Sequence, residues 1–446
     1  MIRKEEGFTL VELIVTMLIF VLVIAAASNI FSSLLNSFKQ QSKIAETNIE
    51  GIVGLDMMRI DIQQAGFGIP WNVELDGDDD GNDDWTVLGA NYNEAAGGDN
   101  ADPTDPIYYN DGDPASSIPA PAQRRAPRGV LAQNDAGPLM GTGANTWRSD
   151  YLVVKSTSIG INAAAQKWTH ISNNGAANLN PRAWNDTNNP ANPKNQNEDL
   201  DDNTDRVIVE RPAMGQGGAQ QRVLITDTSV SPPAFSVLFQ DTAASFPAAF
   251  QPGLDTFETH LIYGVSPKST TTPSEPLRAP FNRADFYVSR PVTNMPSQCA
   301  PNTGILYKAT MNQSNGGFTQ LPLLDCVADM QVVFITDTDN NGVPEWNNAD
   351  FPFTSGLTAD QIRTQIRGVV IYILAHEGQF DRNFIFNNFS DCDNDGAVDA
   401  NCILVGDFIS GTLYGSPFNL LNRIGTNFAN YRWKVYTIAV QLVNLR

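Results

Sequence analysis

The chain has 446 residues, with 49 aspartates and glutamates against 28 lysines and arginines, and a formal net charge of −21. So acidic a chain lacks the basic footprint of a nucleic-acid-binding protein, and its length exceeds the size at which one hydrophobic core usually stops growing. The three histidines lie far apart in sequence without helical zinc-ligand spacing, which argues against a zinc enzyme.

The first feature along the chain is an almost unbroken apolar run from Phe8 to Ala27, preceded by the charged segment Met1–Gly7. About 20 apolar residues can cross a bilayer as a helix. Glu12 interrupts the run, and a charge at membrane depth usually has a partner or a role. A secretory signal is cleaved beyond its apolar region. Here the candidate cleavage point, between Gly7 and Phe8, comes before the run, so cleavage leaves the helix on the mature protein.

This beginning resembles the prepilin motif shared by type IV pilins, minor pilins and type II secretion pseudopilins, through Gly7, Phe8, Thr9, Leu10, Glu12 and Leu13. The resemblance implies that a membrane aspartyl peptidase cuts after Gly7 and methylates the new amino group of Phe8. It also implies that Glu12 pairs with the N-terminal amine of a neighbouring subunit during filament assembly. The alternative is a plain membrane anchor with an incidental glutamate.

Helical periodicity continues past the apolar run and predicts one helix from Phe8 to about Ala65. Gly51 and Gly54 each weaken a helix by about 1 kcal/mol relative to alanine, so they are expected to mark a flexible or locally melted point. Strong stop signals follow directly, at Gly66, Gly68 and Pro70.

Three further strings resemble the PilW-type minor pilins. The helix end carries an Asp-x-x-x-Ala-Gly-aromatic pattern within Met58–Gly68, Ser149–Val154 resembles the first head strand of that group, and Tyr431–Leu445 resembles its C-terminal strand. These matches are less specific than the N-terminal motif. They favour a pilus component over a large, J-like type II secretion pseudopilin.

The rest of the chain predicts a β-rich head. Residues 76–145 and 173–205 are rich in Asp, Asn, Gly, Pro and Ala and are interpreted as long loops or insertions. Short runs rich in Val, Ile, Phe and Tyr predict mostly antiparallel strands. The predicted fold class is α+β and type IV pilin-like: leader 1–7, helix 8–65, and one large head with insertions, 66–446.

The four cysteines are Cys299, Cys326, Cys392 and Cys402. Four cysteines allow three connectivities, and we favour the sequence-local pairs Cys299–Cys326 and Cys392–Cys402 because an exported head meets an oxidising compartment. Free buried thiols are the alternative.

One acidic pattern, Asp-x-Asp-x-(Asp/Asn)-Gly-x-x-(Asp/Glu), occurs three times. Oxygens at positions 1, 3 and 5 can converge on calcium when the position-6 glycine permits a sharp turn, and the position-9 acid binds directly or through water. The predicted ligands are Asp337, Asp339, Asn341 and Glu345; Asp391, Asp393, Asp395 and Asp399; and Asp76, Asp78, Asp80 and Asp84. The loops depart from an EF-hand at position 12, where Val87, Asn348 and Cys402 stand. Ordinary solvated turns are the alternative.

The sequence contains no phosphate-binding glycine loop and no Gly-x-Ser-x-Gly elbow, so no enzymatic activity is expected. The favoured hypothesis is a structural one: a PilW-like minor pilin with a calcium-stabilised head, near the filament tip, priming assembly or carrying an adhesive partner. Its expected partners are other pilins, the prepilin peptidase, inner-membrane assembly machinery and a tip adhesin. We expect it first in the inner membrane, with the head outside the cytoplasm, and then in the pilus. A membrane-tethered, calcium-dependent adhesion module that never enters a filament is the third hypothesis.

Overall fold

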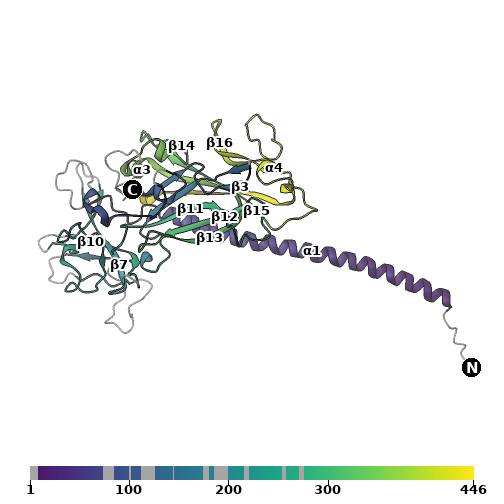
Figure 1. Ribbon diagram of the computed structural model, residues 1–446, viewed down its shortest axis with the longest axis horizontal. Coiled ribbons are helices and arrows are strands. Elements are labelled where there is room, and N and C mark those ends of the chain that lie inside the picture. Colours follow the sequence, from purple (N-terminus) through teal and green to yellow (C-terminus); the bar gives the residue numbers. More distant parts are fainter. Residues whose placement is uncertain are drawn as a thin grey trace, which may run out of the picture.

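The protein consists of one long N-terminal helix and a mostly antiparallel β-rich head, as predicted (Figure 1). The computed structural model describes residues 9–73, 85–99, 102–111, 126–143, 145–173, 180–184, 199–214, 220–253, 258–270 and 276–445. The leader peptide therefore lies outside the described residues.

Helix α1 runs without interruption from Leu10 to Gln63, and its two halves have different surroundings. Its first half projects from the head and carries exposed apolar side chains (Figure 1). In its second half one apolar face is buried, with Met58 and Ile62 fully inaccessible, because this part packs against the large sheet. The helix ends where predicted, since Gly66 adopts a φ of 83° that favours glycine.

The larger sheet contains eight strands and forms most of the main hydrophobic core. Neighbouring strands in it are all antiparallel. Its order is β18 (Arg432–Gln441), β15 (Ile366–Glu377), β13 (Phe318–Thr336), β12 (Gly304–Met311), β11 (Asn282–Ser289), β5 (Tyr151–Ser156) and β2 (Val130–Gln133), with β14 (Glu345–Asn348) paired to β13.

A second, six-stranded sheet lies at the end of the head opposite to the start of α1 (Figure 1). Only its β1–β8 pair is parallel. Its order is β1 (Asn72–Val73), β8 (Gln220–Leu224), β7 (Asp205–Met214), β10 (Thr259–Pro267) and β6 (Trp168–Ser172), with β9 (Val237–Leu238) paired to β7.

Two hairpins and several short helices complete the described head. The hairpins are β3 (Met140–Thr142) with β4 (Asn145–Trp147), and β16 (Cys402–Ile409) with β17 (Thr412–Asn419). The α-helices are α2 (Phe351–Thr354), α3 (Ala359–Gln365) and α4 (Leu420–Arg423). The 3-10 helices are Trp85–Asn91, Pro106–Tyr109, Ala164–Gln166, Ala248–Phe250, Phe428–Asn430 and Val443–Leu445.

The interpretation of residues 76–145 as loop rather than core is wrong in part. Strand β2 lies within it as an edge of the large sheet, and its first three residues are fully buried. A buried ion pair also anchors the segment, because Lys155 Nζ lies 2.8 Å from Glu94 Oε2 and 2.5 Å from Asp111 Oδ2. Buried charges survive where they are paired in this way. The sequence did not predict these features, because a four-residue strand is too short to show a hydrophobic periodicity and buried charged residues do not contribute to one.

Gly54 is a close-packing position, not the flexible point that the sequence suggested. A Cβ built there would lie 1.8 Å from the carbonyl oxygen of Leu323 in β13, so only glycine lets the helix approach the strand this closely. At Gly51 the nearest atom would be Leu324 Cδ1, at 3.2 Å, which belongs to a movable side chain.

These distances predict opposite effects for the same substitution at two positions of α1. Gly54→Ala should destabilise the head by about 3 kcal/mol, because overpacking against backbone forces the helix away. Gly51→Ala should be neutral or stabilising, because alanine gains about 1 kcal/mol of helix propensity. Urea unfolding of the full-length protein in detergent measures both. Equal losses in the two variants would contradict the contact between helix and strand.

Glu210 in β7 is fully buried, and among the described residues neither of its carboxylate oxygens has a hydrogen-bond partner. Burial raises the pKa of Glu210 to about 7, against the opposing effect of the Arg222 charge. The folded state therefore keeps a proton that the unfolded state, with a pKa of 4.5, releases earlier.

The stability of the folded state should consequently fall as pH rises from about 4.5 through about 7, by about 3 kcal/mol in total. Glu210→Gln should remove this loss and make the protein more stable than the unsubstituted chain at pH 8, with little difference at pH 4.5. Urea unfolding at both pH values tests this, with the exposed Asp241→Asn as the control. An unchanged pH dependence in Glu210→Gln would contradict the assignment.

Candidate functional site: the start of the long helix and two acidic loops

The start of α1 is a capping box formed by Thr9 and Glu12. The backbone N–H and the hydroxyl of Thr9 each donate to Glu12 Oε2 at 2.9 Å, and the Glu12 amide donates to Thr9 Oγ1 at 3.3 Å. In the single chain the Glu12 carboxylate is therefore satisfied by its own helix. The predicted cleavage residues, Gly7 and Phe8, lie outside the described residues.

Over its first half, the helix that follows has no apolar partner among the described residues of the head. It is the one helix of the described residues that is long and apolar enough to cross a membrane, and its most apolar window is entirely unburied in the single chain. Large exposed side chains such as Leu10, Phe20 and Ile24 would be costly in water. A bilayer or the apolar helices of neighbouring subunits is the surrounding that this surface requires.

Two of the three acidic loops are described, and they share one conformation. In each, the carboxylate at position 1 accepts from the amide at position 6, and position 9 accepts from the amide at position 2. The side chains at positions 3 and 5 accept from the amides at positions 5 and 7. In both loops the asparagine at position 4 and the glycine at position 6 have positive φ. They are Asn340 and Gly342 in the first loop, and Asn394 and Gly396 in the second.

The loop Asp391–Asp399 brings its ligand candidates together. One carboxylate oxygen from each of Asp391, Asp393 and Asp395 lies within 4.8 Å of the others. Calcium binds oxygens at 2.3–2.6 Å, so two oxygens on the same ion lie at most about 5 Å apart. The amide of Asp395 lowers the pKa of Asp393, but slight desolvation and the charges of Asp395, Asp399 and Asp391 together raise it. A cation would relieve this repulsion.

The loop Asp337–Glu345 has the same backbone but a competing cation. Arg367 Nη2 donates to Asp337 Oδ2 at 3.0 Å, and this bond holds the pKa of Asp337 below its usual range. The Asn341 side-chain amide donates to Asp339 Oδ2 at 2.7 Å, and Glu345 Oε2 accepts from the Thr338 hydroxyl at 2.5 Å. The acids of this loop, Asp337, Asp339 and Glu345, do not form a cluster like that of Asp391, Asp393 and Asp395, and their oxygens are partly occupied by these donors. Metal binding here would require rotation of the Asn341 amide and release of Arg367.

The third loop, with Asp76, Asp78, Asp80 and Asp84, lies outside the described residues. The residues at position 12 of the two described loops are engaged elsewhere: Asn348 Oδ1 accepts from the Gly415 amide, and Cys402 is disulfide-bonded. Any calcium in these loops would rely on the first nine residues alone, which predicts a weaker affinity than that of a complete EF-hand.

Both predicted disulfides are present, Cys299–Cys326 and Cys392–Cys402, and no free cysteine remains. The second bridge ties position 2 of the acidic loop to the start of β16. The first lies beside His376, whose Nε2 accepts from the Ala300 amide at 2.8 Å. Burial lowers the pKa of His376 to about 3. With both sulfurs bonded to one another and Nε2 of His376 engaged, this group is structural rather than a metal site.

Comparison with known proteins supports the interpretation of the N-terminus. Residues 2–28 match the prokaryotic N-terminal methylation motif. A type IV-like pilin from Thermus thermophilus is similar at 12% identity over 40% of this chain and 73% of its own, with a TM-score of 0.17, too low to support further argument. The comparison with curated proteins gives no match. The motif and the observed α+β architecture together support a pilin-type protein, which is a structural component and not an enzyme.

The sequence did not reveal the interactions that hold α1 to the head. Lys308 Nζ of β12 lies 2.7 Å from Asp61 Oδ2 of α1, with both side chains largely buried. Asp61 belongs to the string that resembles PilW-type proteins, but its partner is 247 positions away (308 − 61). The one feature of the sequence that could have indicated this ion pair is Asp61 itself, an acidic residue on the otherwise apolar face of the helix end.

Proposed function

We propose that this protein is a PilW-like minor pilin: a sparsely incorporated component of a type IV pilus that primes assembly or lies near the tip. The observation that carries the proposal is the methylation motif at residues 2–28, continuous with a helix whose apolar first half is unburied by the described part of the head. Cleavage after Gly7 and methylation of Phe8 would leave this helix free to join the helices of other pilins. The prepilin peptidase and the inner-membrane assembly machinery are then its processing and assembly partners.

The size of the head supports a minor role. It holds two sheets and the β16–β17 hairpin, and the six-stranded sheet extends away from the start of α1 (Figure 1). Closely spaced subunits of a filament shaft would have to accommodate this bulk at every position, whereas a tip subunit has neighbours on one side only. The proposed route is from the inner membrane, with the head outside the cytoplasm, to the pilus.

The helix end supports the PilW-like assignment. Three residues of the matching string have structural roles. Asp61 forms an ion pair with Lys308, and Gly66 makes the turn that ends α1. The Phe67 ring packs edge-on against the Tyr263 ring, with 5.6 Å between the ring centroids. This string therefore joins the long helix to both sheets. A J-like secretion pseudopilin shares the N-terminal motif but is not favoured by this string.

The proposal includes calcium in the loops Asp337–Glu345 and Asp391–Asp399. What supports it is the repetition of one turn geometry in the two loops, together with the three converging carboxylates of Asp391, Asp393 and Asp395 in the second. Bound calcium would neutralise carboxylates that otherwise repel one another. By removing this repulsion, bound calcium would stabilise the part of the head nearest the hairpin β16–β17, where an adhesive partner could bind.

Gold-labelled antibody against the head, applied to whole filaments, tests the placement. We expect sparse labelling concentrated at filament ends. Dense labelling along the shaft would contradict a minor role, and labelling of the cell envelope without filaments would favour the membrane-tethered adhesion module. Labelled filaments on unaltered cells, together with normal type II secretion in cells from which the gene is deleted, would speak against a secretion pseudopilin.

A further inference from the structure

Lys155 of β5 contacts two carboxylates, and its side chain is completely buried. Its Nζ lies 2.5 Å from Asp111 Oδ2 and 2.8 Å from Glu94 Oε2. The side chains of both acids are completely buried as well. One amine and two carboxylates are therefore in direct contact at a place that the solvent does not reach.

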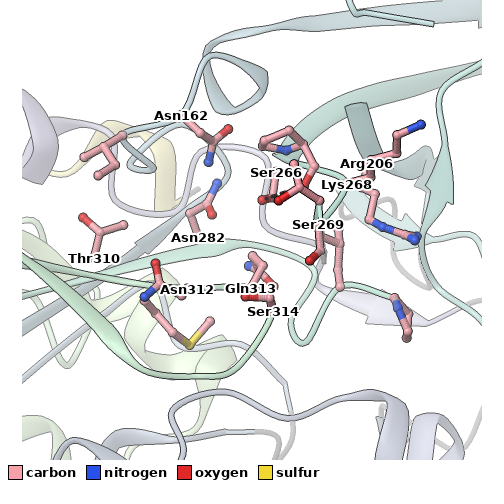
Figure 2. Close-up of a pocket in the computed structure, with 16 residues that line it drawn as sticks. Asn162, Arg206, Ser266, Lys268, Ser269, Asn282, Thr310, Asn312, Gln313 and Ser314 are labelled. Carbon is pink, nitrogen blue, oxygen red and sulfur yellow. Dashed lines mark hydrogen bonds between the residues drawn. The ribbon is translucent and has the colours of Figure 1, made fainter. Parts of the chain in front are cut away.

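The surroundings of the amine are partly aromatic. Lys155 Nζ donates to the Tyr109 carbonyl oxygen at 3.0 Å and lies 5.3 Å from the centre of the Phe281 ring. A polar pocket of about 400 Å³ lies beside the same strands, and Asn282 of β11 lines it (Figure 2). The next residue, Arg283, lies on the opposite face of β11, and it is the register partner of Lys155. The sheet therefore separates the buried amine from this open pocket.

Hydrogen bonds hold both carboxylates against the amine. Arg128 donates to Asp111 Oδ1 from Nε at 2.5 Å and to Oδ2 from its backbone amide at 2.9 Å. Glu94 Oε1 accepts from the Asp111 amide at 2.6 Å, and its Oε2 lies 3.4 Å from Arg283 Nη1. Because Lys155 Nζ is 2.5 Å from one oxygen of Asp111, it is at most about 3.7 Å from the carboxyl carbon Cγ. Reacting atoms in a near-attack arrangement are about 3–3.5 Å apart.

We propose that Lys155 and Asp111 condense into an intramolecular isopeptide bond, with Glu94 as the catalytic residue that carries the proton. The Lys155 ammonium first gives one proton to Asp111 Oδ2, which leaves a neutral amine and a neutral acid. Nζ then attacks Cγ and the C–N bond forms. Glu94 takes the second proton from Nζ and passes it to Oδ2. The bond from Cγ to Oδ2 breaks, the oxygen leaves as water, and Nζ keeps one proton in the amide.

This step needs no oxidant, reductant or cofactor, because one ammonium and one carboxylate become one amide and one water. The net charge of the protein does not change.

The arrangement favours this reaction in three ways. Burial raises the pKa of Asp111, but the charges of Arg128 and Lys155 outweigh it and lower this pKa, so the nearest source of the required proton is Lys155 itself. The proton transfer replaces two buried charges by neutral groups, which the interior of a protein accepts more easily. Arg128 Nε stabilises the oxyanion that develops on Oδ1. Fixed geometry also gives well-oriented groups an effective concentration of about 10⁵–10⁸ M.

The bond would join two segments that are 44 positions apart in the chain (155 − 111). Asp111 closely follows the 3-10 helix Pro106–Tyr109, and Lys155 lies in the large sheet. A covalent link would hold the described part of this insertion on the sheet in denaturant, on heating and under a pulling force. The inference depends neither on calcium nor on entry into a filament.

Tryptic digestion of the full-length protein, purified in detergent and then denatured, tests the proposal by mass spectrometry. Trypsin does not cleave after an acylated lysine, so residues 149–167 should remain in one piece. We expect them in a branched peptide with residues 60–124, lighter than the sum of the two by one water molecule. A digest that releases residues 149–155 as a separate peptide and contains no branched peptide would overturn the proposal.

Two variants and an internal control assign the roles of the residues. Asp111→Ala should give no branched peptide, and Glu94→Gln, which keeps the size of the side chain, should lose most of it. Lys308 is the internal control, because it is also buried against an acid, at 2.7 Å, but among the described residues Asp61 is its only ion-pair partner. Trypsin should therefore cleave after Lys308 in every sample.

A branched peptide in Asp111→Ala would overturn the assignment of the bond. Complete branching in Glu94→Gln, or branching at Lys308, would overturn the catalytic role of Glu94. Melting curves confirm that the variants are folded, and the digest of the unsubstituted protein does not depend on them.

Discussion

Glu12→Ala is expected to leave the protein cleaved and membrane-inserted but to reduce its amount in sheared filaments by tenfold or more. In the proposed filament the Glu12 carboxylate exchanges its capping bonds for the N-terminal amine of a neighbour. Without it, that amine is left as a buried charge with no partner, which is strongly destabilising. Quantitative immunoblotting of filament and membrane fractions measures the ratio.

Thr9→Ala is the matched control for this experiment. It removes the Thr9 hydroxyl from both capping contacts, at a cost of about 0.5–2 kcal/mol to the helix start, but keeps the Glu12 carboxylate. It should therefore enter filaments far better than Glu12→Ala. If the two variants lose the same amount, the effect of Glu12 is helix capping, and the intersubunit pairing is contradicted.

Removal of calcium is expected to lower the melting temperature of the full-length protein in detergent by about 5 °C. Each site contributes about 2.7 kcal/mol when calcium is a hundredfold above its Kd, and larger proteins shift by only a few degrees per kcal/mol. Asp393→Asn with Asp339→Asn should abolish most of the shift. Magnesium should not replace calcium, because it demands near-ideal octahedral geometry.

A different acidic segment of the head, outside the three repeated loops, provides the control for the calcium experiment. Residues 201–205 hold three aspartates but lack the glycine of the shared pattern, and Asp205 is engaged with the Asp201 amide and near Lys167. Asp202→Asn should therefore leave the calcium-dependent shift intact. A melting curve that does not change on chelation, or a shift that survives in the double variant, would make the two loops ordinary solvated turns.

The sequence predicted the features that arise from local patterns. The helix from Phe8 to about Ala65 follows from a long apolar period with stop signals, and the structure places it at Leu10–Gln63. The two disulfides follow from loop closure between nearby cysteines. The repeated acidic spacing predicted a common turn, and the hydrogen bonds of the two described loops agree.

Features that depend on distant partners were not predictable. The pair Asp61–Lys308, the burial of Lys155 with Glu94, and the polar pocket each join segments far apart in the chain. The β16–β17 hairpin was missed because Gly406 and Gly415 interrupt the alternation of its two strands. Gly54 was misinterpreted because helix propensity describes an isolated helix, whereas here the absence of a side chain permits contact with β13.

The central claim is that the protein is a processed prepilin, and the mass of the mature N-terminus tests it most directly. Protein purified from cells with a functional prepilin peptidase should yield an N-terminal peptide that begins with methylated Phe8 and lacks Met1–Gly7. In cells without the peptidase the same peptide should begin at Met1 and carry no methyl group. An intact Met1 in the presence of the peptidase, or a cut beyond Ala27, would contradict the account.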